Sequence, residues 1–221
     1  KLIIPFAEHG SAIIEDPYES PARCVQPIAS PLTRLCWFGH LGWMITDYLI
    51  QEFQKLATEH TYSLHIVTQS DRKSFIQRIA KAICQVNAKC KILFTEWSCN
   101  NTRAVIDMSD FVILPQDHTQ SWFRVKSHNR LIEAIQGGRL AIASPIPAYQ
   151  ELAAYAYIGE SLSEGLEWAK THPQEVTQRI QAGQKYVETR FSPTVIGRKW
   201  ASVLLNLHSA DNVIRYDSRM V

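Results

Sequence analysis

The segment from Lys126 to Arg130 places polar and basic side chains where a helix is expected to begin. Ser127 can serve as the N-cap, because its hydroxyl can accept a hydrogen bond from a free N–H group of the first turn. The remaining N–H groups and the positive end of the helix dipole favour a phosphate group or another anion. Lys126 and Arg130 oppose that dipole, so an anion held between them would explain their position. The alternative is an exposed, polar helix start without a ligand.

Glu133 lies one turn further into the same helix and shares a face with Asn129, four residues before it. A carboxylate in this place can accept hydrogen bonds from a diol such as the hydroxyls of a ribose. The alternative is a solvated glutamate, or one that is paired with a neighbouring cation. Gly137 and Gly138 form a suitable C-terminal cap, after which an apolar strand can follow.

Two further candidate positions follow short apolar runs. Gly39 and His40 come directly after LCWF, and Trp97 and Ser98 come just after KILFT. The glycine could let the backbone approach a phosphate or a sugar, with His40 pointing into the cleft. Trp97 could border a base-binding pocket, with backbone groups near Ser98 contacting the edge of the base. The simpler alternatives are a tight strand-to-helix turn and a core tryptophan. Neither GxGxxG nor GxxxxGK[ST] occurs, so no dinucleotide fingerprint or Walker loop supports the Gly39 site.

The composition is that of an ordinary globular protein. The chain has 221 residues, of which 46% are hydrophobic and 20% are charged, and it is long enough to bury a core. Its net charge of +2 is too small to argue for a nucleic acid or an anionic membrane as partner. No apolar run approaches the ~20 residues needed to span a bilayer, and no signal-peptide pattern opens the chain. The first residues are typical of the interior of a protein, so we expect a segment of something longer.

The cysteines and histidines predict neither disulfides nor a metal centre. The number of cysteines, 5, is odd and no CxxC pair occurs, which favours reduced thiols and a cytoplasmic location. Neither they nor the 8 histidines cluster at zinc-ligand spacing, so no metal is expected. The cysteines are Cys24, Cys36, Cys84, Cys90 and Cys99.

The apolar pattern from residue 34 onward predicts the scaffold that positions these candidates. Short, continuously apolar runs alternate with segments of helical periodicity, as in a parallel sheet with helices on both faces. Strands are expected at 35–38, 62–68, 91–95, 111–115, 139–144 and 156–159, and helices at 41–57, 74–86, 101–108, 127–136 and 148–155. The pattern predicts a Rossmann-like, doubly wound α/β domain of about six parallel strands. Ligands of such sheets bind beyond the carboxyl ends of the strands, near the point where the strand order reverses.

Three regions are expected along the chain. Residues 1–33 are irregular and rich in proline, which is typical of an interdomain linker or lead-in segment. Residues 34–207 form the Rossmann-like domain, which ends in helices expected at 164–171, 173–190 and 194–207. Residues 208–221 are polar, and we expect a loose C-terminal tail.

The order of these motifs resembles the nucleotide-sugar-binding C-terminal domain of the GT-B glycosyltransferases. KSHNRLIEAIQGGRLAIASPIPAYQEL (126–152) is similar to the donor-binding segment of that family, with a polar or basic helix start, then EA, a glycine, an apolar strand and a turn of small residues. SDFVILP resembles the strand before the donor loop, AIIEDPYESP the interdomain crossover, and RFSPTVIGRKWASVLLNL the closing helices. The resemblance covers roughly residues 12 to 207.

The resemblance implies a donor site for a nucleoside-diphosphate sugar, UDP- or GDP-linked, and no other cofactor. The implied contacts follow the positions of the matching motifs. Glu133 would hold the ribose hydroxyls, and Lys126, Ser127 and the amides near His128 and Asn129 would hold the diphosphate or the sugar. Trp97 and Ser98 would meet the base, and Gly39 and His40 would approach the phosphates. Arg130 is a further candidate for binding this substrate, from its place at the helix start.

The chain departs from the family pattern at two places. Many retaining members carry a glutamate eight residues before the one that matches Glu133, and this chain has Val125 there. They also carry an arginine and a lysine just after the first strand, where this chain has His40, Leu41 and Trp43. The two cations at the start of the later helix could replace the missing positive charge.

The resemblance therefore favours the donor-binding half of a glycosyltransferase, whose acceptor would be bound by an N-terminal Rossmann domain outside this chain. Such a site acts by positioning and by electrostatic stabilisation of the leaving diphosphate. No catalytic residue is assigned. The alternatives are a degenerate nucleotide-sugar-binding module without catalysis and a nucleotide-sugar epimerase of the same architecture.

Overall fold

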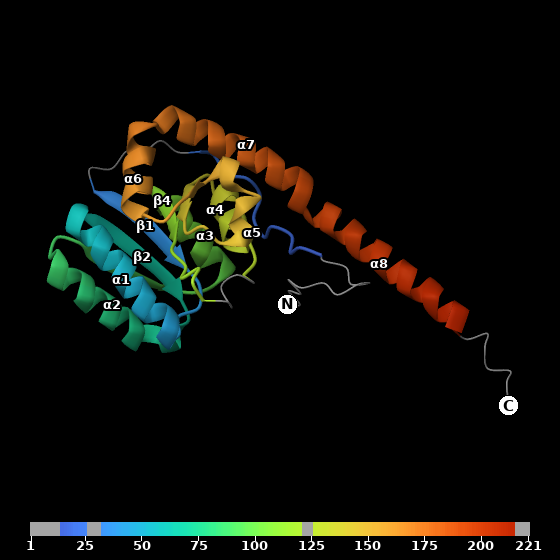
Figure 1. Cartoon of the computed structure of the whole chain (residues 1–221), viewed down its shortest axis with the longest axis horizontal. Coiled ribbons are helices and arrows are strands. Elements are labelled where there is room, and N and C mark those ends of the chain that lie inside the picture. Colours follow the sequence, from blue (N-terminus) through green and yellow to red (C-terminus); the bar gives the residue numbers. More distant parts are fainter. Residues whose placement is uncertain (1–13, 26–31, 121–125, 215–221) are drawn as a thin grey trace.

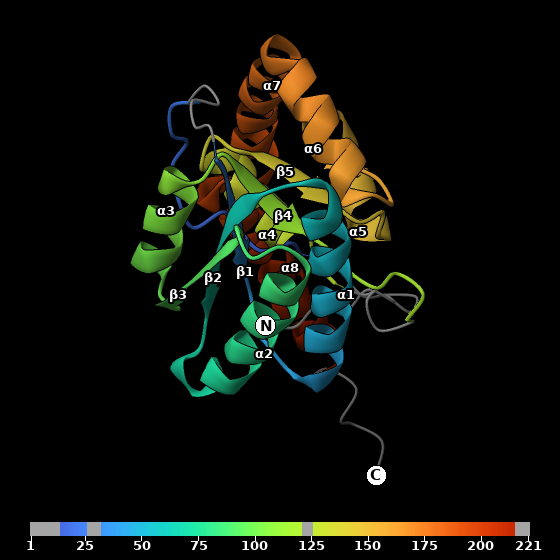
Figure 2. The ribbon, with the colours of Figure 1, turned by 90° about the vertical axis from the view of Figure 1, so that its left-hand side faces the viewer.

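The structure is a computed structural model that describes residues 14–25, 32–120 and 126–214, with side chains described as far as residue 205 (Figure 1). In these ranges a sheet of 6 parallel strands has the order β3-β2-β1-β4-β5-β6 (Figure 2). The strands are β1 (Thr33–Phe38), β2 (Tyr62–Thr68), β3 (Lys91–Glu96), β4 (Phe111–Leu114), β5 (Leu140–Ala143) and β6 (Tyr157–Ile158). This order is that of a doubly wound Rossmann sheet, and it reverses between β1 and β4. The predicted fold class is confirmed.

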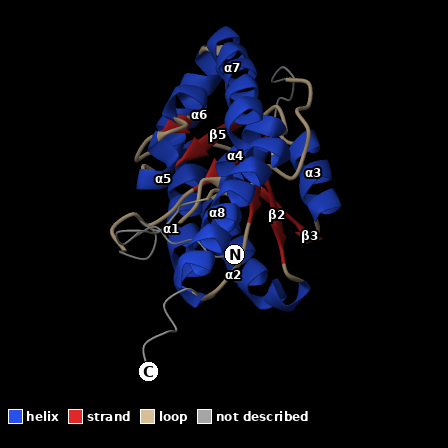
Figure 3. Ribbon diagram, turned by 90° about the vertical axis from the view of Figure 1, so that its right-hand side faces the viewer, coloured by secondary structure: helices blue, strands red, loops and turns tan. Residues whose placement is uncertain are grey.

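Helices cover both faces of the sheet, as the views from the two sides show (Figure 3). The α-helices are α1 (Trp43–Glu59), α2 (Lys73–Val86), α3 (Cys99–Met108), α4 (Asn129–Gln136), α5 (Pro147–Gln150), α6 (Leu162–Thr171), α7 (Pro173–Phe191) and α8 (Pro193–Ile214). Short 3₁₀ turns, η1 (Ser70–Arg72) and η3 (Ala153–Tyr155), join some of them. Side chains of α1, α2 and α6 pack in the core on one face, and those of α3, α4 and α5 in the core on the other.

The two cores explain why the central strands are apolar throughout. Successive side chains of a strand point to opposite faces of the sheet. In β1, Leu35 and Trp37 belong to one core, whereas Cys36 and Phe38 belong to the other. The edge strand β3 differs, because Leu93 is 49% exposed. Continuous burial therefore describes the central strands and not this edge.

A buried arginine closes the turn between α4 and β5. The side chain of Arg139 is 2% exposed, and burial lowers the pKa of its guanidinium. The guanidinium donates hydrogen bonds to main-chain carbonyls at the ends of α3 and α4, those of Asp107, Ser109, Gly137 and Gly138. These bonds satisfy carbonyl groups that a helix end leaves without an intrahelical partner.

The described part of the predicted linker, residues 14–25, lies against the domain, and we call it the lead-in segment. Its backbone donates hydrogen bonds from Tyr18 to the Phe191 carbonyl and from Arg23 to the Gln136 carbonyl. These bonds fix it beside α4 and the end of α7. The rest of the predicted linker, apart from residues 32 and 33, lies outside the described residues.

Helix α8 is longer than the sequence pattern predicts. The helical conformation is interrupted at Ser192, between α7 and α8. The backbone of Ser192 is extended, with φ −65° and ψ 150°, as is favoured before a proline. Helix α8 then runs away from the body to Ile214 (Figure 1). The prediction of a loose tail is wrong for residues 208–214, because the helix continues through them. No helix in the described ranges is both long and apolar enough to cross a membrane.

Candidate functional site

A pocket of about 170 Å³ opens where the strand order reverses, at the carboxyl end of β1. Its walls come from the end of β1, from α3, from α4 and from the lead-in segment. The register of the sheet brings these parts together, because Gly39 donates a hydrogen bond to the Val67 carbonyl and Trp97 donates one to the Thr68 carbonyl. The predicted site residues that line the pocket are Gly39, Trp97, Asn129, Arg130 and Glu133.

Four predicted site residues lie outside the lining of this pocket. The side chain of His40 is exposed to solvent, and Lys126 and Ser127 precede α4. The Ser98 hydroxyl accepts a hydrogen bond from the Asn101 N–H at 3.0 Å, so this serine caps the start of α3. The structure thus places these four residues around the pocket and gives one of them a helix-capping contact.

The predicted N-cap of α4 is wrong. The helix begins at Asn129, and its N-cap is His128, whose side chain makes no capping hydrogen bond. The imidazole of His128 instead packs against Phe191, with 4.7 Å between the ring centres, and burial lowers its pKa. Because His128 turns its ring into the core, the helix starts two residues later than Ser127.

Gly39 makes room for Arg130 at the end of β1. Its φ of +155° is a conformation that side chains disfavour, and a Cβ atom there would lie 3.2 Å from Nη1 of Arg130. The same Nη1 donates a hydrogen bond to the Phe38 carbonyl at 3.2 Å. The guanidinium also lies 6.0 Å from the centre of the Trp37 ring. The strand exit is therefore both a tight turn and the place where a cation reaches the pocket.

Lys126 adds a second positive charge beside Arg130. Burial lowers the pKa of the Lys126 amine, and the charge of Arg130 lowers it further. Two cations that repel each other at a helix start are disfavoured by the helix dipole as well. An anion bound between them would remove both costs.

Glu133 lies deeper in the groove between α3 and α4. Its Oε1 accepts a hydrogen bond from the Glu19 N–H at 2.7 Å. Burial raises the pKa of this carboxyl, and hydrogen bonds from Glu19 and Ser20 act in the opposite direction. Asn129, one turn earlier, donates from its side-chain amide to Asp16 at 2.5 Å. Both predicted ligand groups on this face of α4 therefore also contact the lead-in segment.

The sequence analysis missed the 5 residues of α3 that line the pocket, Cys99, Thr102, Arg103, Ile106 and Asp107, of which the first three share one helical face. Those three lie at positions i, i+3 and i+4. These residues lie within the helix that follows the strand and not directly at the strand exit, where the candidate residues were expected. The spacing of these three residues, followed by Ile106, was a signal that could have found them. Among the described residues, no group of three or more potential ligands could hold a metal ion.

Comparison with known proteins gives matches among solved structures alone. The chain matches no family model and no curated protein sequence. The structure of HepE from Anabaena in complex with UDP-glucose is 14% identical, with a TM-score of 0.64, over 80% of this chain and 49% of that one. A glycosyltransferase from Rickettsia africae is 16% identical, with a TM-score of 0.62, over 79% of this chain and 48% of that one.

A third structure covers a single domain. The C-terminal domain of a group 1 family glycosyl transferase (LpcC) from Francisella tularensis is 14% identical, with a TM-score of 0.52, over 73% of this chain and 87% of that one. The present chain spans about half the length of the HepE and Rickettsia proteins. These likenesses, together with the strand order, show that the chain has the Rossmann-like fold of the C-terminal domain of the GT-B glycosyltransferases.

Proposed function

We propose that this chain is the donor-binding half of a glycosyltransferase and that it binds a nucleoside-diphosphate sugar in the pocket between β1, α3 and α4. The observation that carries the proposal is the position of the pocket at the reversal of the strand order, with Arg130 at the end of β1 and Glu133 deeper in the groove. Ligands of doubly wound sheets bind at this point. The complex of HepE with UDP-glucose supports a sugar nucleotide as the ligand class.

The diphosphate would lie at the start of α4. The first N–H groups of this helix and the positive end of its dipole favour an anion. The Arg130 guanidinium lies at the end of β1, where it donates a hydrogen bond to the Phe38 carbonyl. Lys126 is close enough to Arg130 for its amine to feel the charge of the guanidinium, so it adds a second positive charge at the start of α4. These cations would take the role that the family gives to basic residues directly after the first strand, where the exposed His40 stands.

The nucleoside would extend into the groove between α3 and α4. The second carboxylate oxygen of Glu133 would accept a hydrogen bond from a ribose hydroxyl, since Oε1 already accepts one from Glu19. Trp97 lines the pocket and is 50% exposed, so its ring is available to contact the base. The hydrogen-bond donors and acceptors along the edge of the base would contact residues at the start of α3.

Catalysis would depend on positioning the donor and on stabilising the leaving diphosphate. The position at which many retaining enzymes carry a glutamate, Val125, lies outside the described residues. The acceptor would be bound by an N-terminal Rossmann domain, as in the family. The chain alone is therefore expected to bind a donor without transferring its sugar.

Calorimetric titration of the chain with UDP, GDP and UDP-glucose tests the proposal. We expect at least one of them to bind. If none of them binds with a Kd below about 1 mM, which corresponds to about −4 kcal/mol, the donor site is contradicted. Arg130→Ala should weaken binding of the preferred nucleotide at least about tenfold, because a charge-assisted hydrogen bond to phosphate is lost. Lys81→Ala serves as the control, because it removes an exposed cation from α2 on the opposite face of the sheet.

A further inference from the structure

The lead-in segment holds the carboxylate that the proposed function assigns to the ribose. The Glu19 N–H donates to Oε1 of Glu133 at 2.7 Å, and the neighbouring Ser20 side chain lowers the pKa of the same carboxyl. Ser20 is 3% exposed, so its side chain is removed from water. Two consecutive residues of the lead-in segment thus determine how the carboxylate is oriented.

Arg103 holds those two residues from the other side of the groove. Its Nε donates a hydrogen bond to the Ser20 hydroxyl oxygen, and its Nη2 donates one to the Glu19 carbonyl. Arg103 belongs to α3, Glu133 belongs to α4, and the lead-in segment lies between them. Arg103 therefore acts on the Glu133 carboxylate indirectly, by holding Glu19 and Ser20 of the lead-in segment.

We infer that Arg103 is a positioning residue, which fixes Glu19 and Ser20 so that the Glu133 carboxylate presents its second oxygen to the ribose of a bound nucleotide. The inference rests on the proposed function and adds to it a residue outside the donor motif. A carboxylate with one oxygen held by a main-chain N–H group is preorganised, because its rotation is restricted before the ligand binds.

The charges around Glu133 give this role a measurable consequence. Burial raises the pKa of the Glu133 carboxyl, and the charge of Glu19 adds to that effect. The hydrogen bonds from Glu19 and Ser20 and the charge of Arg103 lower the pKa. The thiol of Cys99 on α3 donates a hydrogen bond to Oε2 of Glu19, and this contact raises the pKa of the thiol. Removal of Arg103 should therefore raise the pKa of Glu133.

The test compares two arginines that both hold the lead-in segment. Arg103→Gln releases Glu19 and Ser20. The matched control, Arg190→Gln, removes the hydrogen bond of 2.7 Å between Arg190 of α7 and Glu15, which lies outside the lining of the pocket, and leaves Glu15 bonded to Lys199. UDP and inorganic pyrophosphate are titrated into each variant and into the unmodified chain. We expect Arg103→Gln to weaken UDP binding about tenfold and pyrophosphate binding less than about twofold, with Arg190→Gln changing neither by more than about twofold.

The pH profile of UDP binding distinguishes loss of the Arg103 contacts from a general loss of structure. Loss of these contacts shifts the pH at which binding weakens in acid, whereas a general loss of structure weakens binding without this specific shift. Binding through Glu133 requires the ionised carboxylate as acceptor. The acid limb of the profile should move to higher pH in Arg103→Gln and should not move in Arg190→Gln. Thermal unfolding of the free variants checks that both remain folded.

The outcomes separate this inference from the proposed function. UDP binding that is as tight in Arg103→Gln as in the unmodified chain overturns the positioning role and leaves the donor site intact. An equal loss of pyrophosphate and UDP affinity also overturns it, because Arg103 would then bind the anion itself. An unmodified chain that binds no nucleotide overturns the proposed function, and the positioning role with it.

Discussion

Arg130 reaches the pocket through contacts that its own helix does not provide. Beyond its bond to the Phe38 carbonyl, the guanidinium acts on the hydroxyl of Tyr149, since burial raises the pKa of Tyr149 and the positive charge of the guanidinium lowers it. That hydroxyl accepts a hydrogen bond from Nε2 of Gln116 at 2.6 Å. Tyr149 and Gln116 are each 0% exposed. Hydrogen bonds in such an environment are strengthened by the low local dielectric, so they hold the cation firmly at the strand exit.

Tyr149→Phe tests this arrangement at the residue scale. The change keeps the ring and removes the hydroxyl, so Gln116 loses its acceptor and Arg130 loses a polar neighbour. We expect UDP affinity to fall roughly three- to tenfold and the free energy of unfolding to fall by about 1 kcal/mol. Calorimetry and urea denaturation measure the two effects. Tyr186→Phe is the control, because its hydroxyl donates to Glu151 at 2.9 Å outside the pocket. Equal UDP affinity in Tyr149→Phe and the unmodified chain would contradict the assignment.

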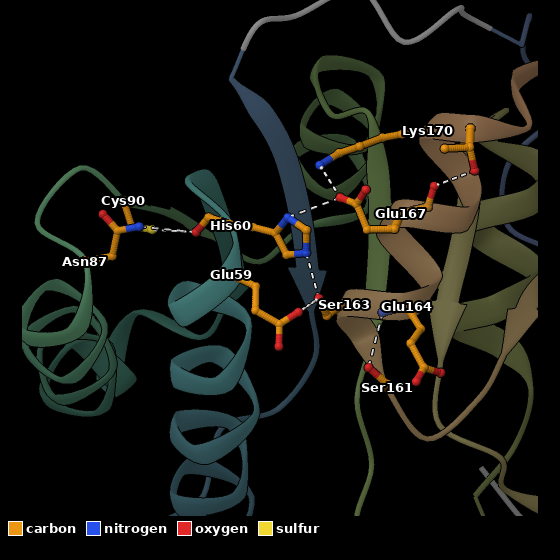
Figure 4. Close-up of polar contacts among 10 residues, drawn as sticks. Glu59, His60, Asn87, Cys90, Ser161, Ser163, Glu164, Glu167 and Lys170 are labelled. Carbon is orange, nitrogen blue, oxygen red and sulfur yellow. Dashed lines mark hydrogen bonds and ion pairs between the residues drawn. The ribbon is translucent and has the colours of Figure 1, made fainter.

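At the scale of elements, a polar cluster joins the end of α1 to α6 (Figure 4). Nε2 of His60 lies 2.7 Å from the Ser163 hydroxyl oxygen, and Nδ1 lies 3.4 Å from a carboxylate oxygen of Glu167. The Ser163 hydroxyl also donates to Glu59. Burial lowers the pKa of His60, the charge of Lys170 adds to this, and Glu167 and Glu59 oppose it. The lowered pKa means that the folded chain favours the neutral imidazole.

This cluster predicts a loss of stability in acid. The ordinary pKa of His60 is 6.5 and its pKa in the folded chain is lower, so its contribution to stability is present above pH 6.5. That contribution is lost as the pH falls below this value, because the unfolded chain then binds a proton more readily. His60→Gln should flatten the dependence of unfolding free energy on pH between about pH 7 and pH 5. His40→Gln is the control, since His40 is exposed. If the unfolding free energy depends on pH with the same slope in the unmodified chain, His60→Gln and His40→Gln, His60 does not have this role.

At the scale of the whole molecule, the described residues form an α/β body from which one helix, α8, extends (Figure 1). The first turn of α8 is anchored, because Ile196 is 2% exposed. Lys199 donates to a carboxylate oxygen of Glu15 in the lead-in segment at 2.7 Å. Further along, Trp200 is 49% exposed and Leu204 is 58% exposed. The start of the helix therefore belongs to the body, whereas these later side chains face solvent.

This division predicts unequal effects of two substitutions in α8. Ile196→Ala should lower the free energy of unfolding by about 2–4 kcal/mol, because it removes buried methyl and methylene groups. Trp200→Gln should change that free energy by less than about 0.5 kcal/mol, because it alters an exposed side chain. Urea denaturation of both variants measures the difference. A large loss of stability in Trp200→Gln would show that its ring packs against the body.

The secondary structure could be predicted because it follows from local patterns. In the strand Tyr62–Thr68, predicted and observed bounds coincide, since β-branched and aromatic residues run between polar turns. Helix ends were less accurate, as at Asn129, because the end of a helix depends on which side chains the rest of the fold buries. The doubly wound class could be expected from the alternation of strands and helices, since right-handed crossovers leave few arrangements, whereas the order β3-β2-β1-β4-β5-β6 comes from the structure.

The sequence by itself determined that this chain alternates strands and helices, and that a basic helix start with Glu133 one turn further in follows a central strand. Those features depend on neighbours within a few positions, so composition and spacing reveal them. Only the tertiary structure decided that Glu19 contacts this carboxylate and that Arg103 holds Glu19 and Ser20. Glu19 and Glu133 are separated by 114 positions, and Arg103 and Ser20 by 83. Such contacts form only when the sheet brings α3, α4 and the lead-in segment together, and local periodicity carries no information about them.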